Sequence, residues 1–154
     1  MTVAHPLDML TAEEITRAKE ILCASDRVPE GSLFAHMVLH EPHKDELARW
    51  KAGDPVERRV RVAVVPGPTM MLHEVVVSVT KDEIVDWRDL TDMRPALLIT
   101  EAIGAILTTK EHPEYVAALA KRGITDLDAV QIDPWPAGVF GYECEEGRRI
   151  TRCI

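Results

Sequence analysis

The seventeen residues from Arg122 to Gly138 constrain the fold more than any other stretch of the chain. Gly123 follows two basic residues, a pattern typical of a helix that ends with a residue in the left-handed conformation. Ile124 is then expected to fold back against Leu119 of that helix. The stretch therefore predicts the end of a helix followed at once by a turn.

A short strand is predicted after this turn. Residues 129–132 are largely apolar, whereas Pro134 and Pro136 lack the backbone N–H that a regular ladder needs to continue. We therefore expect the strand to stop at the Pro-Trp-Pro corner and the ring of Trp135 to be buried.

The first 94 residues predict an α+β layer, with helix packed on an antiparallel sheet. Thr11 and Glu14 have the spacing of a capping box, and apolar residues follow at helical intervals. Later segments alternate apolar and polar residues between turns that contain glycine or proline. The expected elements are helices at 12–24 and 44–50 and strands at 33–41, 57–65, 70–79 and 83–88.

Residues 95–154 predict a second and smaller α+β unit. About sixty residues is near the lower limit for a stable core. Apolar residues at its C-terminal end, including Ile150 and Ile154, indicate a sheet that expects another strand. The expected elements are a helix at 101–109 capped by Thr100, a second helix starting near Pro113, a hairpin at 145–147 and a strand at 149–153.

The charge of the chain excludes several function classes. A net charge of −8, spread evenly along the sequence, argues against nucleic acid as a partner. The apolar runs are far shorter than the ~20 residues that a membrane span needs. The N-terminus shows no basic and apolar leader, so we expect a cytoplasmic protein that does not bind membranes.

The cysteines indicate a reducing compartment. Their number is odd, and Cys23, Cys144 and Cys153 form no C-x-x-C pair. We therefore predict three free thiols.

His36, His40 and His43 raise the question of a metal site. On a strand, His36 and His40 would share a face but stand about 13 Å apart at ~3.3 Å per residue. One zinc or copper ion with ligands ~2 Å away cannot bridge that distance. We interpret these histidines as surface residues.

Asp126, Asp128 and Asp133 are the candidates for acid–base chemistry. Aspartate favours turns and helix starts, and no histidine or nucleophile lies near these residues in the sequence. We interpret them as turn residues.

Arg58, Arg59 and Arg61 form a basic row at the start of a predicted strand. We interpret this row as the exposed face of the strand, with contact to an acidic partner as the alternative. The tryptophans are interpreted as core anchors rather than as a ligand-stacking platform, because aromatic residues are only 5% of the chain. They are Trp50, Trp87 and Trp135.

Three segments resemble the amino-terminal domains of copper-containing primary amine oxidases. The motifs RGITD and DPWPAG, within Arg122–Gly138, resemble the third amino-terminal domain. His5–Asp8 and Leu10–Ile15 are similar to the opening of the second domain, and Thr80–Leu90 to the strand and tryptophan that close it. The resemblance covers nearly the whole chain in the order of the family.

The resemblance implies two cystatin-like domains, residues 1–94 and 95–154, the second incomplete at its C-terminal end. It implies copper and topaquinone for the parent family only. That family makes its quinone from a tyrosine preceded by asparagine and binds copper through a His-x-His pair, and this sequence contains neither asparagine nor such a pair. We therefore predict no catalytic, cofactor-binding or metal-binding residues in this chain.

Three hypotheses follow. The first is a non-catalytic accessory region of a copper amine oxidase, as a truncated or split chain whose partner is a separate catalytic chain or a second copy of itself. The second is a free-standing interaction module of the same fold, because fold does not determine function. The third is an unrelated small enzyme that uses the three aspartates.

Overall fold

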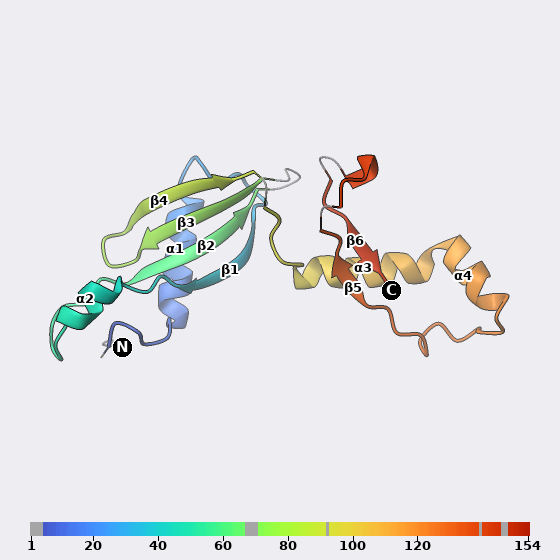
Figure 1. Ribbon diagram of the computed structural model, residues 1–154, viewed down its shortest axis with the longest axis horizontal. Helices are drawn as coiled ribbons and strands as arrows, with labels where there is room; N and C mark the ends of the chain where they lie inside the picture. Colours follow the sequence, from blue (N-terminus) through green and yellow to red (C-terminus); the bar gives the residue numbers. More distant parts are fainter. Residues whose placement is uncertain (1–4, 67–70, 92, 139, 146–147) are drawn as a thin grey trace. The chain divides into compact units, whose positions relative to one another are not determined.

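The computed structural model describes residues 5–66, 71–91, 93–138, 140–145 and 148–154 (Figure 1). The chain divides into two compact units, Met1–Pro95 and Ala96–Ile154. The boundary predicted from the sequence, after residue 94, lies next to this division. That the two units correspond to the second and third amino-terminal domains of the family stays a prediction.

The first unit is a four-stranded antiparallel sheet covered on one face by a helix (Figure 1). The strand order follows the chain, from β1 to β4, as expected for successive hairpins. The predicted α+β class is confirmed. The elements are α1 (Ala12–Cys23), β1 (Leu33–Leu39), α2 (Lys44–Arg49), β2 (Arg59–Val65), β3 (Leu72–Ser78) and β4 (Glu83–Leu90).

Alternation along the central strands builds the core of this unit. Successive side chains on a strand point to opposite faces, so every second residue of β2 and β3 faces α1. Five of these inward positions are fully buried valines, and they pack against Ala18 and Leu22 of α1. The buried valines are Val60, Val62, Val64, Val75 and Val77.

The capping box of α1 forms as predicted. The Thr11 hydroxyl accepts a hydrogen bond from the Glu14 N–H at 3.2 Å, and the Glu14 carboxylate accepts one from the Thr11 N–H at 2.8 Å. The first turn of α1 is thereby held by its own side chains.

Arg58 is buried, with 5% of its surface exposed, so its prediction as part of an exposed row is wrong. The alternation of side chains along the strand explains why Arg58 is buried. Arg58 lies two residues before Val60 and therefore points to the same, helix-facing side of the sheet. Its guanidinium donates to both carboxylate oxygens of Glu14, at 2.7 and 3.2 Å. It also donates to the backbone carbonyls of Pro6, Asp8 and Met9.

The second unit contains two helices and a two-stranded sheet. Its α3 helix packs against both strands, and the two strands pair antiparallel. Within the part of the chain that the structure describes, every helix is too short or too polar to cross a membrane. The elements are α3 (Ile99–Glu111), α4 (Pro113–Ala120), β5 (Pro134–Pro136), a 3-10 turn η1 (Glu143–Glu145) and β6 (Thr151–Cys153).

The helix α3 begins two residues earlier than predicted, and Leu98 rather than Thr100 is its N-cap. Glu101 explains this start. Its carboxylate accepts the Leu98 N–H at 2.9 Å, and it also pairs with Arg149 near the C-terminus. Arg149 donates to the Ala96 carbonyl as well, so one arginine ties the end of the chain to the start of α3.

The Pro-Trp-Pro corner is itself a strand, so the prediction of a strand at 129–132 that ends before it is wrong. Asp133 and Ile154 exchange both backbone hydrogen bonds, at 2.9 and 3.1 Å. Pairs alternate along an antiparallel ladder, so Pro134 and Pro136 occupy positions that require no N–H toward β6. Trp135 is 58% exposed, and its predicted burial is also wrong.

The end of α4 matches the prediction. Gly123 adopts a φ of 79°, its N–H donates to the Ala120 carbonyl, and the Ile124 N–H donates to the Leu119 carbonyl at 3.1 Å. This pair of bonds is a Schellman motif.

The remaining predictions on the second unit concern its C-terminal part. The predicted hairpin at 145–147 falls largely on residues 146 and 147, which lie outside the described residues. The closing strand is shorter than predicted, since it begins at Thr151. The three cysteines are free, as predicted, and all three are exposed.

We predict that Arg58→Lys lowers the free energy of unfolding by about 3 kcal/mol, because a compact ammonium cannot reach the half-buried Glu14 carboxylate and all three backbone carbonyls at once. Urea denaturation followed by far-ultraviolet circular dichroism measures the change. The matched control is Arg61→Lys on β2, which we expect to change stability by less than about 0.5 kcal/mol. Equal losses in the two variants would contradict the clamp role of Arg58.

Gly123→Ala and Gly104→Ala are predicted to have opposite effects. Neither added methyl group meets another atom within 4 Å. Alanine at 123 must adopt positive φ, which costs about 1–2 kcal/mol, whereas alanine within α3 gains about 0.5–1 kcal/mol of helix propensity. Amide hydrogen exchange in α3 and α4 measures both. Similar exchange in the two variants would count against the role of the Gly123 backbone.

Candidate functional site

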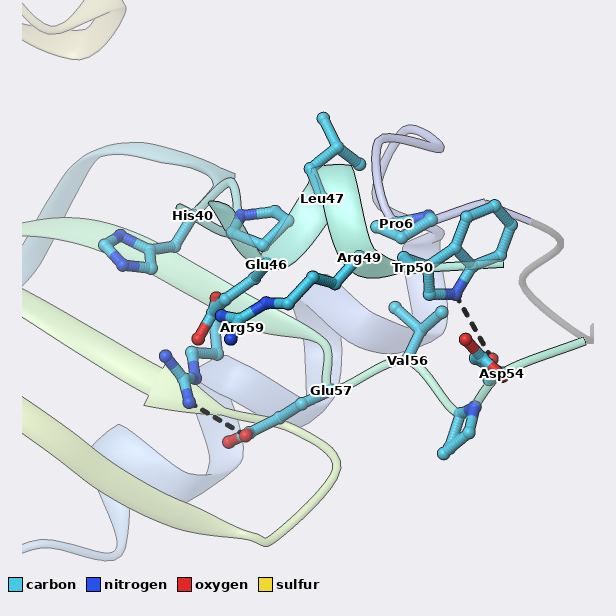
Figure 2. Close-up of a pocket in the computed structure, with 12 residues that line it drawn as sticks. Pro6, His40, Glu46, Leu47, Arg49, Trp50, Asp54, Val56, Glu57 and Arg59 are labelled. Atoms are coloured by element: carbon cyan, nitrogen blue, oxygen red, sulfur yellow. Dashed lines mark hydrogen bonds and ion pairs between the residues drawn. The ribbon is translucent and has the colours of Figure 1, made fainter. Parts of the chain in front are cut away.

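A cavity of about 460 Å³ in the first unit is the candidate site (Figure 2). It lies between α2, the segment before α1 and the start of β2. Its volume is within the range of small-molecule pockets. The apolar lining residues are Pro6, Pro42, Leu47, Trp50, Pro55 and Val56, and the polar ones are His40, Glu46, Arg49, Asp54, Glu57 and Arg59.

The short helix α2 supplies one wall. His43 is its N-cap: its ring nitrogen Nδ1 accepts the Asp45 N–H, and its own N–H donates to Glu46 at 3.2 Å. Glu46 and Arg49 are three residues apart and therefore point from the same side of the helix. Figure 2 shows both side chains directed toward Arg59 on β2.

Trp50 closes the apolar end of the cavity at the C-terminus of α2. Its indole N–H donates to the Asp54 carbonyl at 3.3 Å, and its ring meets the His5 ring edge-on at a centroid distance of 4.9 Å. The Asp54 carboxylate accepts the Lys51 N–H at 2.8 Å, which tightens the loop after the helix. The tryptophan is thus held in place from both sides.

The carboxylate of Glu57 lies in a well-defined polar network. It pairs with Arg59 at 2.8 Å and Lys81 at 3.1 Å and accepts from the Ser78 hydroxyl at 3.0 Å. The Arg59 guanidinium, with help from Lys81 and Ser78, lowers the pKa of Glu57 to about 2. Glu57 is therefore ionised throughout the neutral range.

His40 is a neutral polar group in the cavity wall. Burial lowers its pKa, and the positive charges of Arg61 and Arg59 lower it further. Its ring nitrogen Nδ1 is buried and has no hydrogen-bond partner within the described residues. Its backbone N–H donates to the Arg59 carbonyl at 2.9 Å, which continues the pairing of β1 and β2.

The arrangement suits binding better than acid–base chemistry. A general acid or base works best with a pKa near the operating pH and with access to the substrate. The pKa of Glu57 is far below that range, and Nδ1 of His40 is enclosed.

The three histidines proposed as surface residues do not converge. His36 and His40 lie on the same face of the sheet, four residues apart, and His43 caps α2. In the ranges that the structure describes, no group of three His, Cys, Asp or Glu side chains is close enough to hold a metal ion.

The three aspartates are engaged separately. Asp126 accepts the Asp128 N–H at 3.0 Å, a turn contact of the kind the sequence predicts. Asp128 pairs with Lys110 on α3 at 3.0 Å, and Asp133 accepts from the Gln131 side chain at 2.9 Å.

The basic row and the tryptophans are distributed over different environments. Arg59 lines the cavity, and Arg61 is half-buried on the sheet face opposite α1, where its Nε has no partner within the described residues. Trp87 packs against the core and lies under the guanidinium of Arg27 at 4.0 Å. Trp50 lines the cavity instead of anchoring the core.

Sequence reasoning did not identify Glu46 and Arg49 as cavity residues. Their spacing of three on a predicted amphipathic helix indicates a shared side. Nothing in that spacing indicates which strand they face, because β2 begins ten residues after Arg49.

Comparison with known proteins identifies the family. Residues 11–87 match the family model described as the AGAO-like N2 domain. The chain belongs to this family. It is 37% identical over 153 residues to a primary amine oxidase of Arthrobacter sp. (strain P1), covering 99% of this chain and 23% of that protein. It is 35% identical to a histamine oxidase of Arthrobacter globiformis, and the match covers 96% of this chain and 22% of that protein.

A solved structure supports the same assignment at the level of the fold. A copper-containing benzylamine oxidase from Hansenula polymorpha superimposes with a TM-score of 0.72 at 23% identity, covering 97% of this chain and 24% of that one. The resemblance to copper amine oxidases is confirmed, and the chain corresponds to their N-terminal accessory region. It spans about a quarter of the length of these relatives.

We predict that Glu57→Gln reduces stability at pH 7 by about 1–2 kcal/mol, because an uncharged amide binds Arg59 and Lys81 more weakly. The pKa of Glu57 is lowered on folding, so its contribution is complete above its ordinary value of 4.5 and is lost as the pH falls toward about 2. The variant should therefore lose less stability than the wild type across that interval.

Urea midpoints at a series of pH values measure this difference. Glu30→Gln, at an exposed position of the same unit, is the control and should follow the wild-type curve. Parallel acid profiles for the wild type and Glu57→Gln would contradict the prediction.

Proposed function

We propose that this chain is a non-catalytic accessory region of a copper- and quinone-dependent primary amine oxidase, an enzyme class that converts primary amines to aldehydes. The supporting observation is its alignment to the Arthrobacter primary amine oxidase along 99% of its length. The catalytic step belongs, in this proposal, to polypeptide outside these 154 residues.

The chemistry of the chain supports an accessory role. Its tyrosines, Tyr115 and Tyr142, are not preceded by asparagine, a residue that the chain lacks. The histidines at 36, 40 and 43 do not gather into a ligand set. These residues do not fit copper or a quinone, so no step through either group is assigned to this chain.

The location and partners are part of the proposal. Three free cysteines favour a reducing compartment such as the cytoplasm. The partner would be the catalytic amine-oxidase polypeptide, whether joined to this chain or separate. A negative net charge disfavours nucleic acid.

A free-standing interaction module is the second candidate. It is favoured by the first unit, which encloses a complete core between α1 and the sheet and adds a cavity of its own. Such a module would use that cavity without any oxidase.

Untagged purification from the native source, followed by mass spectrometry, tests the proposal. We expect peptides of this chain to co-purify with amine-oxidase catalytic peptides, in a protein fraction that contains copper and stains for a redox-cycling quinone. The control is the same purification from a strain lacking the gene. Recovery of the chain alone, without copper or quinone, would favour the interaction module.

A further inference from the structure

The cavity of the first unit has a polar end and an apolar end. Figure 2 shows the Arg49 side chain directed toward Arg59 at one end, whereas the Trp50 ring lies at the other. Pro6 and Val56 line the cavity on the Trp50 side. In a pocket with mostly apolar walls, a few polar groups fix the orientation of a small molecule. The cavity therefore suits a molecule with one polar head and an apolar body.

The two arginines of the polar end have hydrogen-bond donors to spare. Arg59 donates through Nη2 to Glu57 at 2.8 Å, and its Nε has no acceptor among the described residues. Within the same described ranges, Arg49 donates only through Nε, to the Asp45 carbonyl at 2.9 Å. A guanidinium carries five N–H donors and no acceptor. The polar end therefore offers donors to a ligand that brings acceptors.

The carboxylates that line the cavity already accept hydrogen bonds from the protein. Glu57 pairs with both Arg59 and Lys81, so one negative charge is shared by two positive ones and Arg59 is not fully neutralised. Glu46 accepts a backbone N–H at the start of α2, and Asp54 accepts one just after this helix. The acceptors are thus engaged, whereas the guanidinium donors are in excess.

Charge at the polar end has the opposite sign to that of the chain. The net charge of the chain is −8, whereas at this end positive side chains outnumber negative ones. The carboxylate of Asp54 lies beside Trp50, at the apolar end (Figure 2). The positive side chains at the polar end are Arg49, Arg59 and Lys81, and the negative ones are Glu46 and Glu57.

We propose that this cavity binds a small organic anion, a carboxylate whose head group pairs with Arg49 and Arg59 and whose apolar or aromatic body lies against Trp50. Planar guanidinium groups match the geometry of a carboxylate. The Trp50 ring is already held by its bond to the Asp54 carbonyl and its contact with His5, so little of its freedom is lost on binding. The site lies within the first unit and does not depend on the accessory role.

The test titrates the full chain with cinnamate, with its uncharged amide and with cinnamylamine, at constant ionic strength. Nuclear magnetic resonance follows the indole N–H signals of Trp50, Trp87 and Trp135. We expect cinnamate to shift the Trp50 signal in a saturable manner and to leave the other two in place. The amide and the amine should bind at least about fivefold more weakly, because neither brings a charged acceptor to the arginines.

Two substitutions in α2 should change cinnamate binding in opposite directions. Arg49→Gln removes a partner of the carboxylate and should weaken binding about threefold to fivefold. Glu46→Gln removes an opposing charge, while its amide oxygen can still accept the His43 N–H, and should strengthen binding about twofold. The matched control is Arg122→Gln, at an exposed arginine that also donates to a carbonyl four residues earlier, and it should bind like the wild type.

Three results would overturn the inference: cinnamate does not shift the Trp50 signal, the amide or the amine binds as tightly as cinnamate, or Arg49→Gln and Arg122→Gln bind cinnamate equally well. The comparison of the three compounds uses the wild-type chain, so it decides the matter even if a variant does not fold. Co-purification with copper and a quinone does not involve this cavity, and the two proposals therefore fail independently.

Discussion

The buried guanidinium of Arg58 is the interaction on which the first unit depends. It joins the start of β2 to the segment before α1 and to the first turn of α1, both of which lie more than forty residues earlier in the sequence. A buried charge is tolerated only when its hydrogen bonds are satisfied, and Glu14 and three carbonyls provide them for Arg58. Pro6 accepts one of these bonds and also lines the cavity, so the clamp that orients α1 shapes the candidate site as well.

The two units differ in how completely they enclose themselves. The first packs a helix on a sheet whose inward valines are fully buried. Among the described residues of the second, Ile132 and Ala137 are the buried apolar side chains, while three apolar residues of α3 remain largely exposed. A unit of this size gains little from its own core. This asymmetry is in line with the accessory role proposed above.

The candidate site was only partly visible in the sequence. His40, Trp50 and Arg59 each attracted attention, but for separate reasons: a metal site, a core anchor and an exposed basic row. Their approach to one another depends on the loop that returns from α2 to β2, and no local pattern specifies that path. The network that lowers the pKa of Glu57 likewise includes Lys81, which is twenty-four residues away.

The sequence alone determined the features that depend on near neighbours. The capping box of Thr11 and Glu14, the glycine at the end of α4 and the alternating valines of β2 follow from spacing of a few residues. Tertiary structure decided the burial of Arg58, the strand at Pro-Trp-Pro and the exposure of Trp135. These features depend on which side of a strand faces a distant partner, and on which ladder positions require an N–H. Pairing between segments sets both, because a shift of one residue exchanges the two faces of a strand.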